Sequence, residues 1–367
     1  MASPLASSTV PRVSTSHGSS IILFGGPSSE RLVSVASAQH ISRVLPEARC
    51  WFWAPDGRVT EVSRESLQAH ERPFERPFFP GSTGTLSPAA GSWPDCERAF
   101  DHCPADTVVI LALHGSGGED GHIQRILEDR RLCFTGSSAA ASMLAFDKAA
   151  AKKVLRKNGI RVAESEVVSG QDLPGAERLL RALRDRTGRA VMKPVADGSS
   201  NGVCFIADEA SIHTALGLLR KDPAVIYLGE LFVQGTELTV GVHDTASGSR
   251  ALPVSEVRMD AGRNFDYAGK YLGKGTVELT PAEIPDSVRD AAQHVALVAH
   301  RAIGCYGYSR TDMIVDSEGP VFLEINNLPG MTQASFIPQQ LAAAGISMKD
   351  FLERQIELAR TRFKDRT

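Results

Sequence analysis

The stretch RTDMIVDSEGPVFLEIN, residues 310–326, decides the fold of the C-terminal part of the chain. Two runs of residues with high β propensity flank a turn at 316–320, which predicts a β-hairpin. Because successive side chains on a strand point to opposite faces, a register symmetric about Glu318 brings six residues onto one face. They form the pairs Ile314 with Phe322, Asp312 with Glu324, and Arg310 with Asn326.

This face combines two carboxylates, an amide and a guanidinium. Opposed carboxylates such as Asp312 and Glu324 repel each other unless a cation lies between them. Together with Asn326 they offer only hard oxygen ligands, which suit Mg²⁺, or alternatively Mn²⁺, bound together with phosphate oxygens. Arg310 suits a phosphate or a developing oxyanion. The alternative is a solvated sheet face on which Arg310 forms a salt bridge.

A second polar stretch, VMKPVADGSSNG at residues 191–202, lies between two predicted strands, 190–193 and 203–207. Small residues expose successive backbone N–H groups that can surround a phosphate, and Lys193 adds a point charge. No G-K-[ST] follows and no helix begins at the end of the stretch, so it is not a P-loop. A plain hairpin connection is the alternative.

The N-terminal part predicts an α/β unit. Apolar strands at 20–24 and 107–114 each end in a glycine-rich loop, and helices follow at 29–45 and from about His122. Asp120 breaks a dinucleotide-binding fingerprint, so a small zwitterionic ligand fits better than a dinucleotide. Glu30 could hold its ammonium, although a carboxylate in a first helical turn is also common. His114 could equally be a hydrogen-bonded core histidine.

Periodicity predicts four further helices, at residues 145–158, 210–220, 287–303 and 347–363, and a strand at 238–242. The proline-, glycine- and phenylalanine-rich segment 71–106 predicts an irregular surface segment. Residues 1–19, rich in Ser, Thr and Pro, predict a disordered tail without targeting features.

Composition sets the broad class. The chain has 367 residues, 42% of them hydrophobic and 23% charged, as expected for a globular protein of two or three units. A formal net charge of −3 argues against a nucleic-acid or membrane-surface partner, and no apolar run is long enough to span a bilayer. The six cysteines are scattered, which favours reduced thiols in a cytoplasmic protein.

Taken together, these segments resemble the D-alanine–D-alanine ligases of the ATP-grasp superfamily, from about residue 20 to the C-terminal helix. The resemblance rests on the ordered motifs GGPSSERLVS, LHGSGGEDG, FTGSSAAASMLAFDK, KPVADGSSNG, GTELTV, DYAGKY, SRTD and LEINNLPGMTQASF. It implies an α/β fold, with a parallel-sheet N-terminal substrate-binding domain followed by a two-subdomain, α+β ATP-grasp fold. The expected boundaries are 1–19 for the tail, 20–136, 137–229 and 230–367.

The resemblance also implies roles at matching positions. ATP would contact the residues Lys148, Lys193, Ser200, Glu230, Val233, Glu237 and Lys270. Mg²⁺ would bind Asp312, Glu324 and Asn326. Glu30 would hold the ammonium of the first D-alanine, and Ser199 and Tyr271 would join it to close a loop over the site. The remaining substrate and transition-state contacts would come from Val33, His114, Arg310, Gly330, Ser335 and Phe336.

The implied reaction joins two D-alanines through an acyl phosphate, for cell-wall precursor synthesis in a cytoplasmic homodimer. Departures from the family pattern occur at 272–280, Asn201, Leu231 and Phe336, near acceptor recognition and loop closure. They leave open a dipeptide or amino-acid ligase of specialised metabolism with a different amine substrate. Glu30 and Ser335 disfavour an ATP-grasp enzyme for non-amino-acid substrates. A non-catalytic nucleotide-binding protein would be expected to lack Arg310, Asp312, Glu324 or Lys193, and all four are present.

Overall fold

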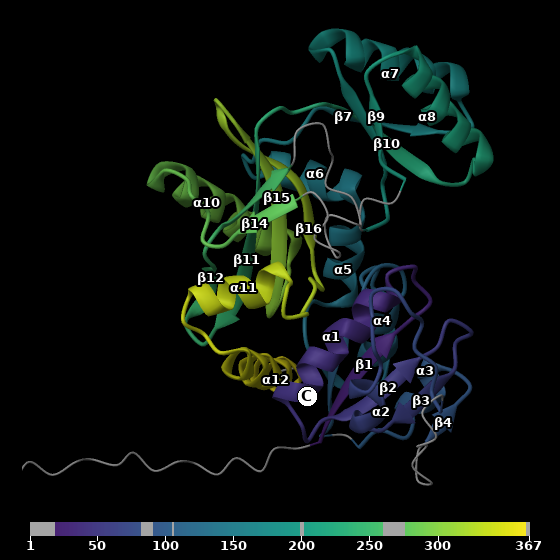
Figure 1. The fold of residues 1–367 in the computed structure, drawn as a ribbon, viewed down its shortest axis with the longest axis vertical. Helices are drawn as coiled ribbons and strands as arrows, with labels where there is room; N and C mark the ends of the chain where they lie inside the picture. The colour runs from purple at the N-terminus through teal and green to yellow at the C-terminus, as the bar shows by residue number, and fades with distance from the viewer. Residues whose placement is uncertain (1–18, 82–90, 105, 199–201, 260–275, 365–367) are drawn as a thin grey trace, which may run out of the picture.

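The computed structural model describes residues 19–81, 91–104, 106–198, 202–259 and 276–364. Within them the chain forms three β-sheets, each packed with helices, that follow one another along the sequence (Figure 1). The mixed α/β architecture with an N-terminal parallel sheet confirms the predicted fold class.

The first sheet has the strand order β4-β3-β2-β1-β5-β6. Its parallel part contains β1 (Ser20–Gly25), β2 (Arg49–Trp53), β5 (Val108–Ala112) and β6 (Cys133–Phe134). The predicted strands β1 and β5 are buried on both faces, as their continuous apolar runs require. The antiparallel edge is formed by β3 (Val59–Val62) and β4 (Ser92–Trp93).

Four helices accompany this sheet: α1 (Arg31–Val44), α2 (Arg64–Gln68), α3 (Cys96–Phe100) and α4 (His122–Asp129). The first and last confirm the predicted helices. The expectation of a wholly irregular 71–106 segment was wrong, because β4 and α3 lie within it. Asp95 caps α3 by accepting a hydrogen bond of 2.7 Å from the backbone N–H of Arg98, which stabilises so short a helix.

The central sheet is antiparallel, in the order β7-β10-β8-β9. Its strands are β7 (Ser165–Ser169), β10 (Ile226–Leu231), β8 (Ala190–Pro194) and β9 (Cys204–Ile206), and its helices are α7 (Leu173–Thr187) and α8 (Glu209–Lys221). The predicted strands β8 and β9 pair as a hairpin, and α8 confirms the helix predicted at 210–220. This unit has a local core that includes Leu180, Met192, Ile206 and Leu216.

The third sheet is antiparallel, in the order β14-β13-β11-β15-β16 with β12 on β11. Its strands are β11 (Thr236–Thr245), β12 (Gly248–Ala251), β13 (Ser255–Met259), β14 (Thr276–Leu279), β15 (Tyr308–Asp316) and β16 (Gly319–Asn326). Helices around it are α5 (Ala139–Phe146), α6 (Lys148–Lys157), α10 (Asp286–Ile303), α11 (Phe336–Ala343) and α12 (Met348–Lys364). The amphipathic pattern predicted α10 correctly, and Ser347 with Asp350 three residues on predicted α12. Gly304 ends α10 at a positive φ of 80°.

The helix predicted at 145–158 is confirmed as α6, but its predicted start was wrong, because the chain bends at Asp147 and residues 145–146 end α5. Asp147 has φ −84° and ψ 97°, and its carboxylate accepts a hydrogen bond of 2.9 Å from the backbone N–H of Ala150. The side chain therefore caps a second helix, α6, which begins at Lys148. Both helices pack in the core of the third sheet, with residues such as Val295 and Phe322.

The hairpin of β15 and β16 pairs Arg310 with Asn326 and Asp312 with Glu324, as predicted. The predicted pair of Ile314 with Phe322 is wrong, because a bulge shifts the register after Asp312 and sets Met313 opposite Phe322. The extra residue is Leu323. The bulge buries Phe322 in the core and leaves Leu323 and Glu324 together in the wall of a cavity.

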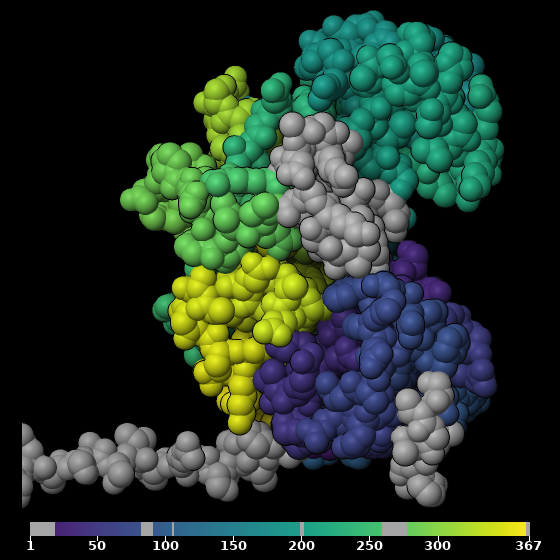
Figure 2. All heavy atoms as spheres, viewed as in Figure 1, coloured from purple at the N-terminus to yellow at the C-terminus, as the bar shows by residue number. Residues whose placement is uncertain are grey.

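The first core extends beyond the N-terminal sheet. It also contains Leu328 and Met331, which follow β16, and Phe351 and Phe363 of α12. Figure 2 shows the same arrangement on the surface, where the yellow C-terminal residues lie directly against the purple and blue N-terminal unit. The N-terminal unit and the C-terminal end are thus one packed body, whereas the central core is local to residues 168–227.

Candidate active site

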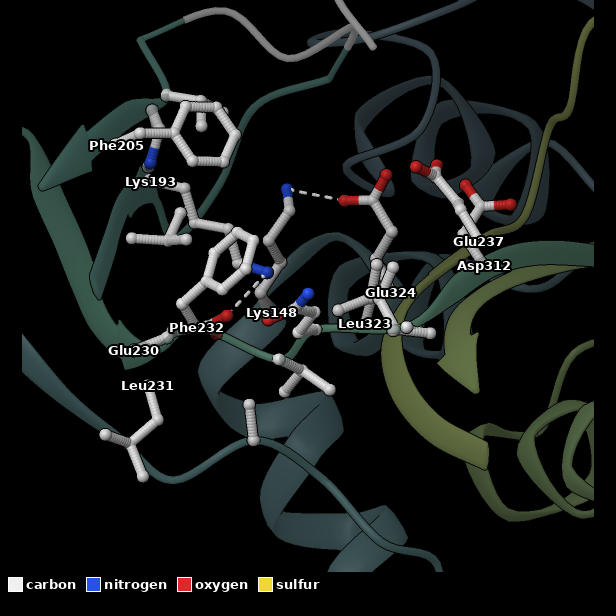
Figure 3. Close-up of a pocket in the computed structure, with 18 of the residues that line it drawn as sticks. Lys148, Lys193, Phe205, Glu230, Leu231, Phe232, Glu237, Asp312, Leu323 and Glu324 are labelled. Atoms are coloured by element: carbon white, nitrogen blue, oxygen red, sulfur yellow. Dashed lines mark ion pairs between the residues drawn. The ribbon is translucent and has the colours of Figure 1, made fainter. Parts of the chain in front are cut away.

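A cavity of about 260 Å³ lies between the central and third sheets (Figure 3). Side chains of β8, β9 and β10 line one side, those of β11, β15 and β16 line the other, and Lys148 extends between them from the start of α6. Seven of the ten residues predicted to contact ATP or metal line this cavity: Lys148, Lys193, Glu230, Val233, Glu237, Asp312 and Glu324.

One end of this cavity, which we call the nucleotide cleft, is apolar. Phe205 of β9 and Phe232 after β10 have ring centroids 6.4 Å apart in an edge-to-face arrangement. Leu231 and Leu323 also line the cleft, and the bulge in β16 places Leu323 there. A flat heteroaromatic ring would find apolar contacts on several sides.

Charged side chains also line the cleft, some of them beside the aromatic rings (Figure 3). The Nζ atom of Lys148 lies 3.4 Å from a carboxylate oxygen of Glu324, and that of Lys193 lies 2.9 Å from Glu230. Lys152, which is only 1% exposed, also forms an ion pair with Glu230. Burial and the neighbouring Lys193 lower the pKa of Lys152 to about 8. Although burial opposes ionisation of Glu230, the two lysines hold the pKa of its carboxyl below its usual value.

The predicted metal ligands meet at the end of the hairpin. Asp312 accepts hydrogen bonds from Arg310 Nε at 2.9 Å and Nη2 at 2.7 Å, from Asn326 at 3.3 Å, and from Thr239. In the described segments no group of three or more His, Cys, Asp or Glu side chains is arranged to hold a metal ion. Two carboxylates and one amide therefore fit Mg²⁺ that takes its other ligands from phosphate oxygens and water, and do not fit an all-protein cage.

A second cavity, which we call the amino-acid cavity, adjoins the first, because Gly198 and Glu324 line both. It brings together eight predicted residues from distant parts of the chain: Glu30, His114, Arg310, Glu324, Asn326, Gly330, Ser335 and Phe336. The guanidinium carbon of Arg310 lies 5.7 Å from the ring centroid of Phe336. Val33 does not join them, since it is fully buried within α1 and lines neither cavity.

His114 is buried and hydrogen-bonded through both ring nitrogens. Nδ1 lies 3.0 Å from the carbonyl oxygen of Leu328, and Nε2 lies 3.1 Å from Oγ of Ser37. Burial lowers the pKa of His114 to about 4, so the ring is neutral at physiological pH. The histidine thus lines the cavity and is also the satisfied core residue that we considered as an alternative.

Four predicted residues, Ser199, Ser200, Lys270 and Tyr271, lie outside the described residues. The cavity region also contains residues that were not predicted, among them Glu119, Lys152 and Phe205. Glu119 is buried, accepts a hydrogen bond of 2.8 Å from Gly115, and has a pKa raised to about 8 by burial and by Glu30. Lys152 lies one helical turn after Lys148, on the same buried face of α6 as Leu155. This spacing could have indicated from the sequence that Lys152 lies near Lys148. Nothing in the sequence marked Phe205 as a site residue, because apolar residues on strands usually belong to the core.

Comparison with known proteins agrees with this geometry. Family models described as "D-ala D-ala ligase N-terminus" and "D-ala D-ala ligase C-terminus" match residues 19–137 and 154–357. A D-alanine–D-alanine ligase of Mycobacterium sp. (strain KMS) is 34% identical over 367 residues, covering 92% of this chain and 95% of the relative. One from Methylorubrum extorquens (strain PA1) is 38% identical over 257 residues, covering 68% and 80%.

Among solved structures, the VanG D-Ala:D-Ser ligase from Enterococcus faecalis is similar, with a TM-score of 0.76 and 25% identity over 93% of this chain and 99% of that chain. The family models together span most of the described sequence, and the mycobacterial relative spans nearly all of it. The chain belongs to the D-alanine–D-alanine ligase family.

Proposed function

We propose that this protein is an ATP-dependent ligase that joins two D-alanines to D-alanyl-D-alanine through an acyl phosphate. The observation that carries the proposal is the meeting of the two cavities at Gly198 and Glu324. A nucleotide whose base occupies the apolar end would extend its phosphates toward Lys148 and Glu324. A carboxylate held beside Arg310 would then lie next to the terminal phosphate.

The nucleotide cleft fits ATP in three parts. Phe205, Phe232 and Leu231 would enclose the adenine, and Val233 and Glu230 would complete the hinge beside it. Glu237 would accept hydrogen bonds from the ribose hydroxyls. Lys148 and Lys193 would contact the phosphates, and we assign Ser200 and Lys270 to the same role from the family pattern.

Asp312, Glu324 and Asn326 would hold Mg²⁺, or Mn²⁺, at the terminal phosphates. When bound, the metal offsets the negative charge gathered during phosphoryl transfer. The chain's own contribution is positional, because Arg310 and Thr239 fix the carboxylate of Asp312 by hydrogen bonds. These bonds orient the ligand before the metal arrives.

In the first step a carboxylate oxygen of D-alanine attacks the γ-phosphorus of ATP, and ADP leaves. Glu30 would hold the ammonium of this D-alanine, with Ser199 and Tyr271 closing the site over it. In the second step the amine of the other D-alanine attacks the acyl carbon. Arg310 and the Gly330 N–H would stabilise the oxyanion. The bond between the acyl carbon and the phosphate oxygen then breaks, and phosphate leaves with the proton that the attacking nitrogen loses.

The second amine substrate is set by the far end of the amino-acid cavity. Ser335 would bind its carboxylate, and Phe336 packs beside Arg310 at this end. His114 and Val33 would support the pocket from the N-terminal unit. A D-Ala:D-Ser ligase among the similar structures makes acceptor identity the point that most needs measurement.

The product suits peptidoglycan precursor synthesis in the cytoplasm. We propose that the protein acts as a homodimer. Its tail, N-terminal, central and C-terminal units would divide near residues 19, 136 and 229. No helix in the described residues has both the length and the apolar character needed to cross a membrane. Small amino acids, rather than nucleic acid or lipid, are the proposed partners.

Phosphate release with ATP and Mg²⁺ tests the proposal, using D- and L-amino acids supplied singly and in pairs and products identified by mass. We expect D-alanine alone to give D-alanyl-D-alanine. No phosphate release with D-alanine but turnover with another pair of amino acids would contradict the assignment and favour a ligase of specialised metabolism.

A further inference from the structure

The loop that joins β16 to α11, residues 327–335, carries Gly330 into the amino-acid cavity, and we call it the Gly330 loop. Leu328 and Met331, on either side, are buried in the first core. A Cβ atom on Gly330 would lie 2.7 Å from Oγ of Ser335, so a larger residue here would force the Ser335 hydroxyl to move. The half-buried Gly330 and the buried Pro329 thus lie between two buried anchors.

Side chains of the N-terminal unit hold the loop backbone on both sides of Gly330. The carbonyl of Leu328 lies 3.0 Å from Nδ1 of His114, and the carbonyl of Met331 lies 2.7 Å from Nδ1 of His40. The N–H of Met331 donates to Oγ of Ser37 over 3.2 Å. Since carbonyl oxygens only accept, both Nδ1 atoms must carry the hydrogen.

These requirements fix the direction of every bond. A neutral His114 that donates from Nδ1 must accept at Nε2, and Ser37 Oγ lies 3.1 Å away to donate. The relay thus runs from the Met331 N–H through Ser37 and His114 to the Leu328 carbonyl. The depressed pKa of His114 is consistent with the neutral ring that this relay needs.

We propose that Ser37 and His40 are positioning residues that, together with His114, aim the Gly330 N–H at the oxyanion formed when the amine attacks. This inference rests on the proposed ligase function. Neither side chain lines the amino-acid cavity, so each would act through the loop and not on the substrate. Pro329, the residue before Gly330, restrains the loop backbone further, because its ring fixes its own φ.

The decisive measurement separates the two chemical steps. Rapid-quench kinetics with ATP, Mg²⁺ and D-alanine follow ADP, which reports acyl-phosphate formation, and dipeptide, which reports amine attack. For Ser37→Ala we expect ADP formation within about 3-fold of wild type and dipeptide formation slower by roughly 10- to 100-fold, since a displacement of about 1 Å has effects of this order. Phosphate release should then exceed dipeptide formation, because the acyl phosphate is lost to water.

Ser42→Ala is the matched control, because Ser42 is an equally buried serine of α1 that contacts Gln39 and Gln68 and not the loop. His40 is only half-buried and gives a variant that tests the same idea with less risk to folding. His40→Leu should slow dipeptide formation selectively, and His40→Asn, which keeps a donor near Nδ1, should restore it.

Equal slowing of both steps in Ser37→Ala and His40→Leu, or the same effect in Ser42→Ala, would overturn the inference. Failure of the proposed function itself would be recognised separately. In that case the wild-type chain would form no ADP in the presence of D-alanine, and the positioning role would fall with it.

Discussion

The two cavities are built in contrasting ways. The walls of the amino-acid cavity come from N-terminal and C-terminal segments that share one hydrophobic core. The walls of the nucleotide cleft come from units with separate cores, and contacts across it include the Lys152–Glu230 ion pair and the hydrogen bond from Lys148 to the carbonyl of Asp197. The amino-acid cavity thus rests largely on one shared core, whereas polar contacts such as the Lys152–Glu230 ion pair join the two sides of the nucleotide cleft.

This difference separates a site that is formed in advance from one that its ligand completes. The hydrogen-bonded Gly330 loop is satisfied before any substrate arrives, so it needs little reorganisation. In the nucleotide cleft, Lys148 and Lys193 are paired with Glu324 and Glu230, which are themselves proposed ligand contacts. ATP and Mg²⁺ must therefore replace existing ion pairs, and charge changes should act mainly on the nucleotide half.

Arg310 lines the amino-acid cavity and holds Asp312, which lines the nucleotide cleft, so its loss should give the largest effect. Arg310→Ala removes the proposed oxyanion cation and both hydrogen bonds that orient Asp312. We expect kcat to fall by about 10³-fold or more, while the Kd for ATP changes little, because no contact to the base is lost. Steady-state kinetics and calorimetric ATP titration check both values, and near-normal ligase activity would contradict the assignment.

The same hairpin supplies a control at its other end. Arg161 pairs with Asp316 at the turn through two hydrogen bonds of 2.9 and 3.0 Å, far from either cavity's reacting end. Arg161→Ala removes a comparable arginine–carboxylate pair. It should keep kcat within about 2-fold, because exposed ion pairs contribute little.

His114 tests the preformed half through acid stability. Its pKa is about 4 in the folded chain and about 6.5 when unfolded, so only the unfolded chain takes up the proton as pH falls through this window. The stability present above pH 6.5 should therefore decrease by up to about 3 kcal/mol on approaching pH 4. Denaturant unfolding at both pH values should show a smaller loss in His114→Gln than in wild type. An equal loss in the two proteins would mean that His114 is not buried as a neutral ring.

The hairpin illustrates how far sequence reasoning reaches. Alternation of side chains correctly predicted that Asp312 faces Glu324 and that Arg310 faces Asn326. It failed beyond Asp312, because the bulge at Leu323 accompanies a tertiary contact in which the Phe322 N–H donates to the carbonyl of Arg161. Local periodicity contains no information about that partner.

The same limit applies to the cavities. Glycine-rich loops after β1 and β5 pointed to a ligand at the strand ends, and Glu30 and His114 do line the amino-acid cavity. Gly330, which also lines this cavity, was predicted from the family resemblance and not from the spacing of residues. The ion pair between Lys152 and Glu230 joins residues 78 positions apart, so nothing local could reveal it.

Glu324 tests the charged half. Glu324→Gln removes one proposed metal ligand and the partner of Lys148 while preserving shape. The Mg²⁺ concentration for half-maximal activity should rise at least about 10- to 100-fold, the range found when weaker, outer-shell metal contacts are lost. Glu318→Gln at the exposed turn is the control and should leave the Mg²⁺ dependence unchanged. An unaltered Mg²⁺ requirement in Glu324→Gln would remove this residue from the metal site.

The apolar end of the nucleotide cleft should give the smallest effect, because its contacts are made before and during the reaction alike. Phe205→Ala removes a ring that faces the cleft beside Phe232. The loss of roughly 0.5–1.5 kcal/mol of ring contact corresponds to a 2- to 10-fold rise in the KM for ATP, with kcat nearly constant, as uniform binding requires. Phe79→Ala controls for loss of an exposed ring, since Phe79 is 64% exposed and lines neither cavity. A fall in kcat without a change in KM would mean that Phe205 acts on the chemical step, which would contradict the proposed difference between the two sites.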